Sequence, residues 1–347
     1  MRTRFTRLAA PALLTALLAT AGCGALDESS GASEDGAKSG TTTVKVGYLH
    51  TIAVDDKLWL GQIEGQFADQ GLSIKPVQFD TGIAESQALA GGSIDVAIMG
   101  GVTSNFPAQG QGEVFMANSV ETDTAQLWVQ PDSGITSVED LRGKTIATTE
   151  GTTADIYLLR ALQGAGLTRD DVKVVNAAMP SAVQAFAGGS VDAIALWVPF
   201  DLRVKEAVPG AKMIDSAGNY PNAAVLDGWI ANNQWFKENP DTIRKIIRAW
   251  LATNRAFRED PEGSLKKVYE KAYTEDATLA DIQHQFKYQT DYTNAEWLQH
   301  FQNGDVLDWV GQAEKAYVEL GGVPQYVDPA EFFNTSLFID EAKKDAQ

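Results

Sequence analysis

Two short groups of glycine and hydroxyl residues follow apolar runs that predict buried strands. Gly101, Val102 and Thr103 follow one run, and Thr152 and Thr153 follow another at the start of a predicted helix. A helix start that presents free backbone N–H groups and hydroxyls binds anions. Ligands of open α/β sheets lie beyond the carboxyl ends of the strands. These residues therefore predict a crevice for an anionic group; the alternative is that Thr152 only caps its own helix.

Two further candidates lie in apolar stretches. Asp227 interrupts the run 223–231, and Trp197 stands at the end of another predicted strand. An unpaired buried carboxylate costs several kcal/mol or is forced to protonate. We therefore expect a Lys, an Arg or a bound cation as the partner of Asp227. His50 and Thr51 fall at the carboxyl end of the first predicted strand and are added to the candidate site.

Patterns that would indicate catalysis are missing from the sequence. The histidines His50, His284 and His300 are widely separated, no cysteine follows Cys23, and G-x-S-x-G, H-E-x-x-H and C-x-x-C do not occur. A Gly-Lys-Thr triplet lacks the earlier glycine of a phosphate-binding loop, because Val138 occupies that place. We expect a binding protein without metal or cofactor, and not an enzyme.

A stretch that occurs twice organises the elements around these groups. Residues 83–100 and 180–197 share a Gln, a Gly-Gly-Ser triplet and an Asp (Asp95 and Asp192) at a constant offset of 97. Each copy reads as a short helix stopped at the glycine pair, followed by an apolar strand of the kind that is buried on both faces of a parallel sheet. A chance repeat of a helix stop explains the glycines but not the shared Gln, Asp and strand. The pattern indicates two similar α/β lobes.

The length of 347 residues also favours two lobes, because a single core rarely grows beyond roughly 250 to 300 residues. We expect residues 44–131 and 228–347 to form lobe 1, with the helical C-terminal segment packing on it. Residues 132–227 are expected to form lobe 2 as an insertion. The chain then crosses between the lobes twice, and a ligand is held in the cleft between them.

The N-terminus has the features of an export signal. Residues 1–22 combine three arginines with an apolar stretch too short to span a membrane, and the only cysteine, Cys23, follows small residues. We expect a lipoprotein signal peptide, lipid attachment at Cys23 and a flexible tether over 23–43, which lacks aromatic side chains. The formal net charge of −18 argues against nucleic acid as a partner.

The stretches VKVGYL, FDTGIAESQALAGGSIDVAIMG, GTTADIYLLRAL, VDAIALWVPF and VLDGW together resemble the substrate-binding proteins of ABC importers for taurine, aliphatic sulfonates and nitrate. The similarity covers nearly all of residues 44–260 and is strongest to the taurine branch. It implies a two-lobed α/β fold of the periplasmic-binding-protein type II, and as partners a permease and its ATPase.

In the taurine branch, the loop after the third strand and a Thr-Thr helix start receive the sulfonate. An aromatic residue of the W-x-P segment lines the cleft, and the Asp of the L-D-x-W segment receives the amine. The resemblance carries these roles to the loop Gly101 to Thr103, to Thr152 and Thr153, to Trp197 and to Asp227.

Two residues depart from that pattern. Val102 stands where a hydroxyl is usual, and Glu150 places a negative charge beside the expected anion cradle. A zwitterion, most simply taurine or a related aminosulfonate, fits an acid, an aromatic ring and a helix start together. We expect a lipid-anchored, monomeric binding protein outside the cytoplasm. The alternatives are another small amine or quaternary ammonium ligand, a sensor, or a pyrimidine-precursor enzyme, a class that shares this fold.

Overall fold

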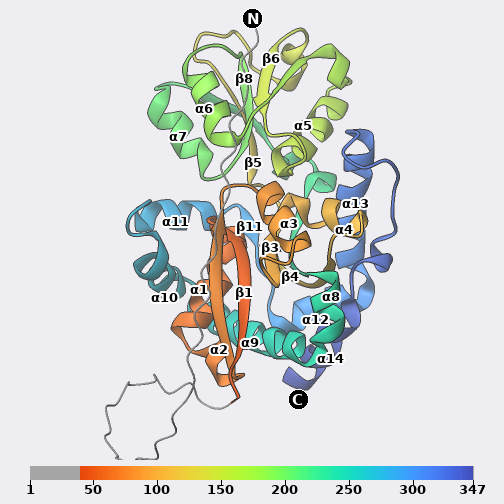
Figure 1. Cartoon of the computed structure of the whole chain (residues 1–347). Helices are drawn as coiled ribbons and strands as arrows, with labels where there is room; N and C mark the ends of the chain where they lie inside the picture. The colour runs from red at the N-terminus through yellow and green to blue at the C-terminus, as the bar shows by residue number, and fades with distance from the viewer. Residues whose placement is uncertain (1–39, 347) are drawn as a thin grey trace, which may run out of the picture. The chain divides into compact units, whose positions relative to one another are not determined.

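The computed structural model describes residues 40–346 as a mixed α/β structure built on two sheets (Figure 1). The expectations for the signal peptide over residues 1–22, for Cys23 and for the tether up to residue 39 lie outside the described residues. The first strand already begins at Thr42, because the β-branched Thr42 and Thr43 continue its alternation. The tether predicted up to residue 43 therefore overlaps the first two residues of this strand.

The first sheet has six strands in the order β11-β4-β10-β3-β1-β2. Their bounds are β1 Thr42–Leu49, β2 Leu72–Phe79, β3 Val96–Met99, β4 Glu113–Glu121, β10 Val225–Ala231 and β11 Gln289–Thr290. β1 pairs in parallel with β2 and β3, whereas β10 runs antiparallel to β3 and β4. All four residues of β3 are buried, as the apolar run predicts for a strand covered on both faces.

The second sheet has five strands in the order β7-β6-β8-β5-β9. Their bounds are β5 Ala125–Val129, β6 Thr145–Thr148, β7 Lys173–Asn176, β8 Ala193–Trp197 and β9 Lys212–Ser216. β6 is parallel to β7 and β8, and β5 is antiparallel to β8 and β9. We refer to the structure built on the first sheet as lobe 1 and to that built on the second as lobe 2.

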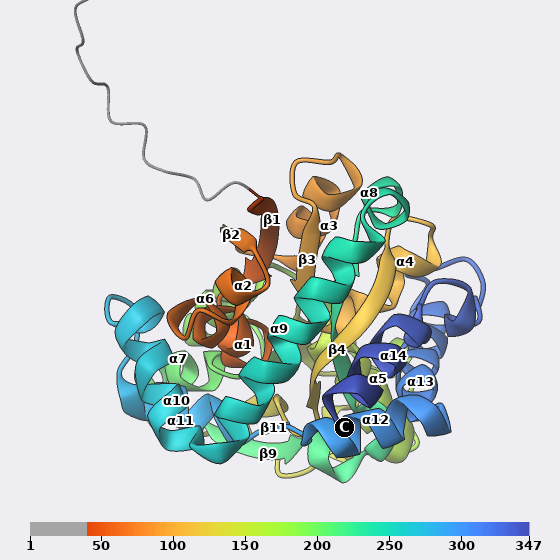
Figure 2. The ribbon, with the colours of Figure 1, turned by 90° about the horizontal axis from the view of Figure 1, so that it is seen from below.

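The helices cover the faces of the two sheets (Figures 1 and 2). Lobe 1 carries α1 Ile52–Ile63, α2 Gln66–Asp69, α3 Gly82–Ala90, α4 Asn105–Ala108, α8 Asn233–Glu238, α9 Pro240–Glu259, α10 Pro261–Val268, α11 Leu279–Phe286, α12 Asn294–Asn303, α13 Asp305–Glu319 and α14 Thr335–Asp345. Lobe 2 carries α5 Thr153–Gly164, α6 Met179–Ala187 and α7 Phe200–Ala207. The stripe of Ile243, Ile246, Ile247 and Trp250 on α9 is fully buried in the core of lobe 1, as predicted for the C-terminal helices.

The repeated stretch has the same role in both lobes. The backbone N–H of Lys45 donates to Asp95 at 2.8 Å, and that of Thr145 donates to Asp192 at 2.8 Å. Each aspartate, which directly precedes a strand, thus accepts a backbone hydrogen bond from the neighbouring strand of its sheet. The second glycine of each pair has a left-handed backbone, with φ of 70° at Gly92 and 68° at Gly189. The prediction of two similar α/β units is confirmed by this shared arrangement.

Both crossings between the sheets lie before the positions that we expected. β5 belongs to the second sheet, so the chain leaves lobe 1 over residues 122–124 and not at 131. On its return, the chain passes through 217–224, and the whole of β10, including Asp227, lies in the first sheet. The Pro-Asp-Ser-Gly turn at 131–134 ends a strand without a change of sheet, because a short polar link before β5 already makes the crossing.

Side chains of the two lobes also touch away from the sheets. Arg160 on α5 pairs with Glu319 on α13 at 3.1 Å, and His284 Nε2 on α11 lies 2.7 Å from Asp201 Oδ2 on α7. A small apolar cluster joins α5 to α13 through Ile156 and Tyr317. The described lobes therefore hold each other through contacts at two separate places.

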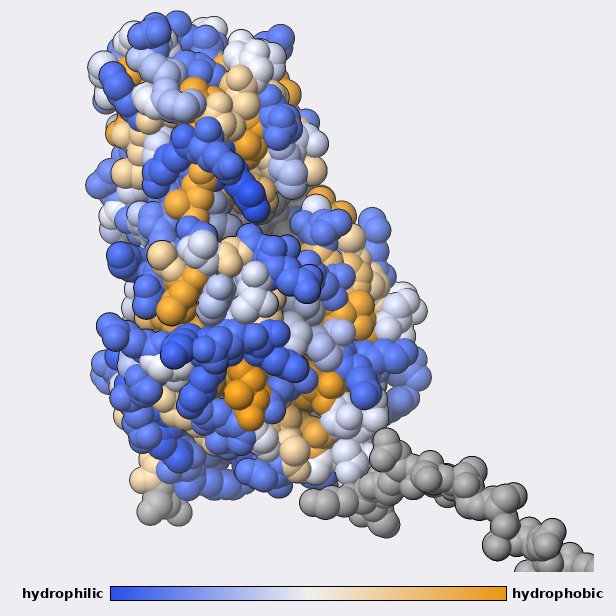
Figure 3. Space-filling model, turned by 90° about the vertical axis from the view of Figure 1, so that its left-hand side faces the viewer, coloured by the Kyte–Doolittle hydropathy of each residue, from blue (hydrophilic) through white to orange (hydrophobic). Residues whose placement is uncertain are grey.

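The face shown in Figure 3 is mostly hydrophilic, with hydrophobic residues in small separate groups. The large apolar side chains that are exposed among the described residues are Ile63, Ile83, Met213 and Tyr326. Within residues 40–346, the helices are all too short or too polar to cross a membrane.

Candidate functional site

A cavity of about 250 Å³ lies between the carboxyl ends of the strands of both sheets. β1 of lobe 1 and β8 of lobe 2 end at its wall with Leu49 and Trp197, and the residues directly after β3 and β6, Gly100 and Thr149, also line it. This is the place at which open α/β sheets bind ligands. The two sheets therefore build one site between them.

The structure brings most of the predicted site residues to this cavity. The residues of that set that line it are Thr51, Gly101, Glu150, Thr152, Thr153 and Trp197. His50, Thr103 and Asp227 do not line it. The backbone of Val102 lies in the short helical turn after β3, and its side chain is outside the described part of the structure.

His50 packs into lobe 1 instead of facing the cavity. Its Nδ1 lies 3.0 Å from Asp55 Oδ2, and its ring stacks on Tyr273 with centroids 3.9 Å apart. Burial lowers the pKa of His50, but the hydrogen bond with Asp55 and the charges of Asp55 and Asp276 outweigh this, so the pKa is raised. His50, which was predicted for the site, does not line the cavity, because the chain turns into α1 at Thr51 and the ring of His50 lies against Asp55 and Tyr273.

The hydroxyls expected to receive an anion donate to acceptors of the protein itself. Thr103 Oγ1 donates to the Met99 carbonyl at 2.6 Å, and Thr152 Oγ1 donates to the Thr149 carbonyl at 2.7 Å. Thr153 Oγ1 donates to Glu121 Oε1 at 3.2 Å. The start of α5 has no capping acceptor from the side chain of Thr152. What this region offers a ligand is its backbone N–H groups more than its hydroxyls.

Glu121, which the sequence analysis missed, is a buried carboxylate in the cavity wall. It is the last residue of β4, and besides Thr153 it accepts a hydrogen bond from Thr124 Oγ1. The sequence does mark Glu121 as unusual, because it ends an apolar strand directly before a crossing. As for Asp227, a carboxylate buried there without a partner would be costly.

Asp227 lies fully buried behind Glu121 and forms a carboxyl pair with it. Ser119 Oγ donates to Asp227 Oδ2 at 2.5 Å, and Oδ1 has no N–H or O–H donor among the described residues. Burial raises the pKa of Asp227 well above its usual range, and the charge of Glu121 raises it further. Burial also raises the pKa of Glu121, although hydrogen bonds from Asp227, Thr124 and Thr153 oppose this.

Two carboxyl groups form a hydrogen bond only when a proton lies between them. The shared proton lies most stably on Asp227, because burial and the charge of Glu121 both raise the pKa of Asp227. Among the described residues, the neighbours of the Asp227 carboxyl group are Ser119 and the carboxyl group of Glu121, and no ion pair joins it to a Lys or an Arg.

The remaining charges at the cavity are also negative. Glu150 is about half exposed and lies 3.4 Å from the guanidinium of Arg169, and Asp80 is the third carboxylate in the wall. No Lys, Arg or His lines the cavity among the residues that the structure describes. Trp197 and Phe200 form an apolar wall, with their rings edge to face at 5.4 Å. This electrostatic environment favours a ligand with positive charge or N–H donors.

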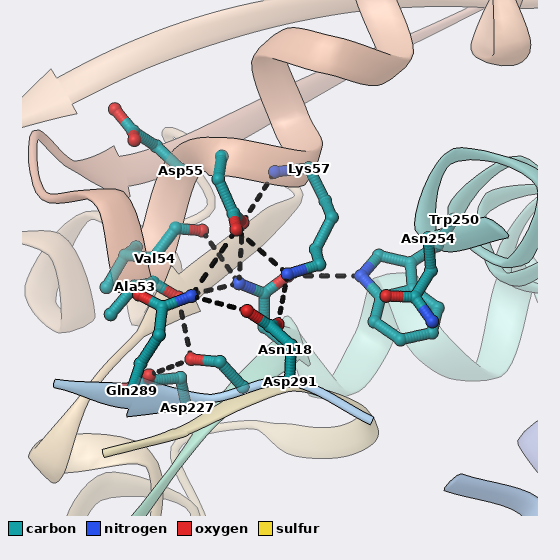
Figure 4. Close-up of polar contacts among 12 residues, drawn as sticks. Ala53, Val54, Asp55, Lys57, Asn118, Asp227, Trp250, Asn254, Gln289 and Asp291 are labelled. Carbon is teal, nitrogen blue, oxygen red and sulfur yellow. Dashed lines mark hydrogen bonds and ion pairs between the residues drawn. The ribbon is translucent and has the colours of Figure 1, made fainter. Parts of the chain in front are cut away.

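A network of polar groups supports the wall from inside lobe 1 (Figure 4). The fully buried Lys57 contacts Asp56 at 2.8 Å and also Asp291, and Gln289 Nε2, which borders the cavity, donates to Asp291 at 2.9 Å. Asn118 donates to the Ala53 carbonyl at 2.7 Å. The network thereby fixes the start of α1 and the end of β4 relative to each other.

Tyr317 on α13 ties the two predicted anion loops together. Its buried hydroxyl donates to the Gly101 carbonyl of lobe 1 and lies 3.2 Å from the Gly151 carbonyl of lobe 2. Gly101 is needed there, because a Cβ at this position would stand 2.7 Å from the backbone nitrogen of Thr153. The two lobes are thus in close contact beside the cavity.

We expect Tyr317→Phe to weaken ligand binding by up to about tenfold, because it removes a hydrogen bond worth roughly 0.5 to 1.5 kcal/mol that holds the lobes together. Calorimetric titration of the purified protein measures the change. Tyr157→Phe is the matched control, since the Tyr157 hydroxyl donates to Asp215 at 2.9 Å within lobe 2. If both variants lower the affinity equally, the contact between the lobes is not the cause.

Among the described residues, no three His, Cys, Asp or Glu side chains are arranged so that they could hold a metal ion.

Comparison with known proteins places the chain in a defined group. The model of the NMT1/THI5-like family matches residues 57–264. A protein of Brucella abortus (strain 2308) that is named as a binding protein is 29% identical to this chain over 298 residues. The match covers 85% of this chain and 91% of that protein. The taurine-binding periplasmic protein of Escherichia coli (strain K12) is 27% identical over 195 residues, or 55% of this chain and 59% of that protein.

Solved structures share the fold. The alkanesulfonate-binding protein SsuA from Xanthomonas axonopodis pv. citri, bound to MOPS, has a TM-score of 0.67 at 20% identity and covers 84% of this chain and 98% of its own. The desulfurization enzyme DSZB has a TM-score of 0.65 at 13% identity, and the match covers 87% of this chain and 99% of the enzyme. The predicted two-lobed periplasmic-binding-protein fold is confirmed, and the enzyme among these structures means that fold alone does not separate binding from catalysis.

Proposed function

The chain belongs to the NMT1/THI5-like family, and on that premise we propose that it is the solute-binding component of an ABC importer outside the cytoplasm. The observation that carries the proposal is the cavity of about 250 Å³ to which both lobes contribute strand ends. Such a cavity encloses a ligand fully only when the lobes are together, so ligand binding favours the closed state. A permease that distinguishes the closed from the open state accepts the loaded protein.

The proposal includes the partners and the location expected from the sequence. Residues 1–22 serve as the signal peptide, Cys23 carries a lipid that holds the protein at the outer face of the cell membrane, and the protein acts as a monomer with a permease and its ATPase. No reaction is performed on the ligand. The support is the lack of a histidine or a cysteine among the described residues of the cavity wall, since these side chains are common nucleophiles and general bases.

The ligand that we propose is a small molecule with an amine. Taurine or a related aminosulfonate is the first candidate, because relatives are named for taurine and aliphatic sulfonates. A small amine or quaternary ammonium compound is the second candidate. It is favoured by the three carboxylates of the wall, Asp80, Glu121 and Glu150, and by the aromatic pair Trp197 and Phe200.

A thermal-shift panel on the purified protein tests the function. The panel contains taurine, alkanesulfonates, nitrate, sulfate, betaine, choline, simple amines and amino acids. A ligand at a hundredfold excess over its dissociation constant stabilises the native state by roughly 2.7 kcal/mol, which raises the melting temperature measurably. A panel without any shift, extended to a general metabolite library with the same result, would contradict a solute-binding role.

We expect Trp197→Ala to weaken the binding of the ligand found in this way by about 10- to 100-fold. The substitution removes an apolar face from the cavity wall and enlarges the cavity, at a cost of roughly 1.4 to 2.8 kcal/mol. Trp128→Ala is the control, because Trp128 is buried in lobe 2 and does not line the cavity. Unchanged affinity in Trp197→Ala would mean that this ring only packs against Phe200.

A further inference from the structure

The start of α5 already faces a carboxyl group that belongs to the protein. Glu121 comes from the end of β4 in lobe 1 and accepts a hydrogen bond at 3.2 Å from Thr153, the first residue of α5 in lobe 2. A carboxylate is stabilised at a helix N-terminus by the helix dipole and the free N–H groups. Glu121 thus interacts with the same helix end that was predicted to receive the acid group of a ligand.

The surroundings of Glu121 leave little for a second anion. Gly101 packs against α5 so closely that a Cβ would lie 2.7 Å from the Thr153 nitrogen and 2.9 Å from its hydroxyl. The described residues of the cavity wall include no cation that could offset another negative charge. A sulfonate beside Glu121 would therefore meet a like charge in a largely desolvated place, where repulsion is strong.

The buried partner of Glu121 favours the ionised form of Glu121, because its hydrogen bond opposes the rise in pKa that burial causes. Asp227 is fully buried and is held in place by Ser119, so its carboxyl group donates toward Glu121 and does not reach the cavity. A hydrogen bond from a neutral acid stabilises the ionised form of its neighbour. Of the two carboxyl groups, the one that faces the ligand is therefore that of Glu121.

We propose that Glu121 substitutes for the acid group of the ligands bound by sulfonate-binding relatives, so that this site takes a small organic cation or amine that lacks an acid group. The inference rests on the proposed function, because it assigns a ligand class to the same cavity. It selects between the two candidate ligands named above. Glu121 neutralises the cationic group, and the apolar wall of Trp197 and Phe200 contacts its hydrocarbon part.

Three matched probes test the proposal on the wild-type protein: taurine, ethanesulfonate, which lacks the amine, and ethylamine, which lacks the sulfonate. Choline and phenethylamine extend the amine set to larger cations. By calorimetric titration, we expect at least one of the three amines to bind at least tenfold more tightly than ethanesulfonate and taurine. This ranking needs no variant and so does not depend on how a substitution affects folding.

Glu121→Gln provides the second measurement. We expect it to weaken binding of the amine at least 30-fold and to strengthen binding of ethanesulfonate, since the amide has the same shape but no charge. Glu85→Gln is the control, because Glu85 is equally buried in lobe 1 but does not line the cavity. It should leave both affinities unchanged.

Other outcomes separate the two proposals. Tighter binding of taurine or ethanesulfonate than of any amine would overturn the role of Glu121 while supporting a solute-binding function. Unchanged amine affinity in Glu121→Gln would also overturn it. If no amine probe binds, the inference fails, and the solute-binding function is decided by the wider panel alone.

Discussion

Replacement of Lys57 by methionine is expected to lower the free energy of unfolding by about 3 to 5 kcal/mol, the range found when one partner of a buried ion pair is removed. The Lys57 side chain is fully buried, and both carboxylates that it contacts, Asp56 and Asp291, have side chains no more than 1% exposed. Methionine has a volume similar to that of lysine and leaves no cavity. The decrease in the free energy of unfolding therefore comes from the two carboxylates that have lost their partner.

The loss should depend on pH. Burial raises the pKa of Asp56 to about 7, although Lys57 opposes this effect. An acid whose pKa is raised by folding contributes stability that is present below its unfolded value, roughly 4, and is lost as the pH rises through the folded value. Without Lys57 the folded value rises further, so the deficit of the variant is larger at pH 8 than at pH 5. Denaturant unfolding at the two pH values measures the difference.

Two comparisons complete this experiment. Lys267→Met removes an exposed lysine that pairs with Glu64 at 2.7 Å, and it should change stability far less. Lys57→Met combined with Asp291→Asn should recover part of the loss, because the second change removes one of the stranded charges. A loss as small in Lys57→Met as in Lys267→Met would show that the buried network does not stabilise lobe 1.

Gly101→Ala is expected to weaken ligand binding by about 10- to 100-fold while leaving each lobe folded. The added methyl group would stand 2.7 Å from the Thr153 nitrogen of the other lobe, a contact that neither backbone can absorb without moving. Forcing an extra carbon into a packed place costs roughly 1 to 3 kcal/mol, and 1.4 kcal/mol is a factor of ten in affinity. The open state avoids the clash entirely, so the cost falls on closure.

Calorimetric titration gives the affinity, and small-angle X-ray scattering with saturating ligand shows whether the lobes still close. Gly188→Ala is the matched control. Gly188 also has a negative φ, of −77°, and it ends α6 away from the cavity. Wild-type affinity in Gly101→Ala would mean that the ligand is bound without the close approach of Gly101 to α5.

Much of the fold followed from local pattern. The glycine pairs and the aspartates Asp95 and Asp192 predicted two equivalent helix-strand units, and the structure gives both aspartates the same backbone partner. The crossing over residues 122–124 could not be predicted in this way. An apolar strand pairs equally well in either sheet, and the choice of β5 for the second sheet depends on pairing with β8 and β9, which are distant in sequence.

The strand ends predicted where the candidate site lies, but they did not predict which side chains point into the cavity. Thr152, Thr153 and Trp197 line the cavity because the carboxyl ends of strands meet there. Two carboxylates lie on neighbouring strands β4 and β10, and only Glu121 reaches the cavity, whereas Asp227 stays behind it. Sequence identifies both as unusual, but it does not show which one is nearer the ligand, since that depends on the irregular register between these strands.

The contacts of Arg160 with Glu319 and of His284 with Asp201 join the lobes with side chains that do not line the cavity. The measured affinity of a protein with a binding-competent state is its intrinsic affinity scaled by the fraction of molecules in that state. Weakening either contact lowers that fraction by the same factor whatever molecule is bound. Residues that do not line the cavity thus set how tightly this protein binds, independently of the residues that set what it binds, so the two properties can change separately in evolution.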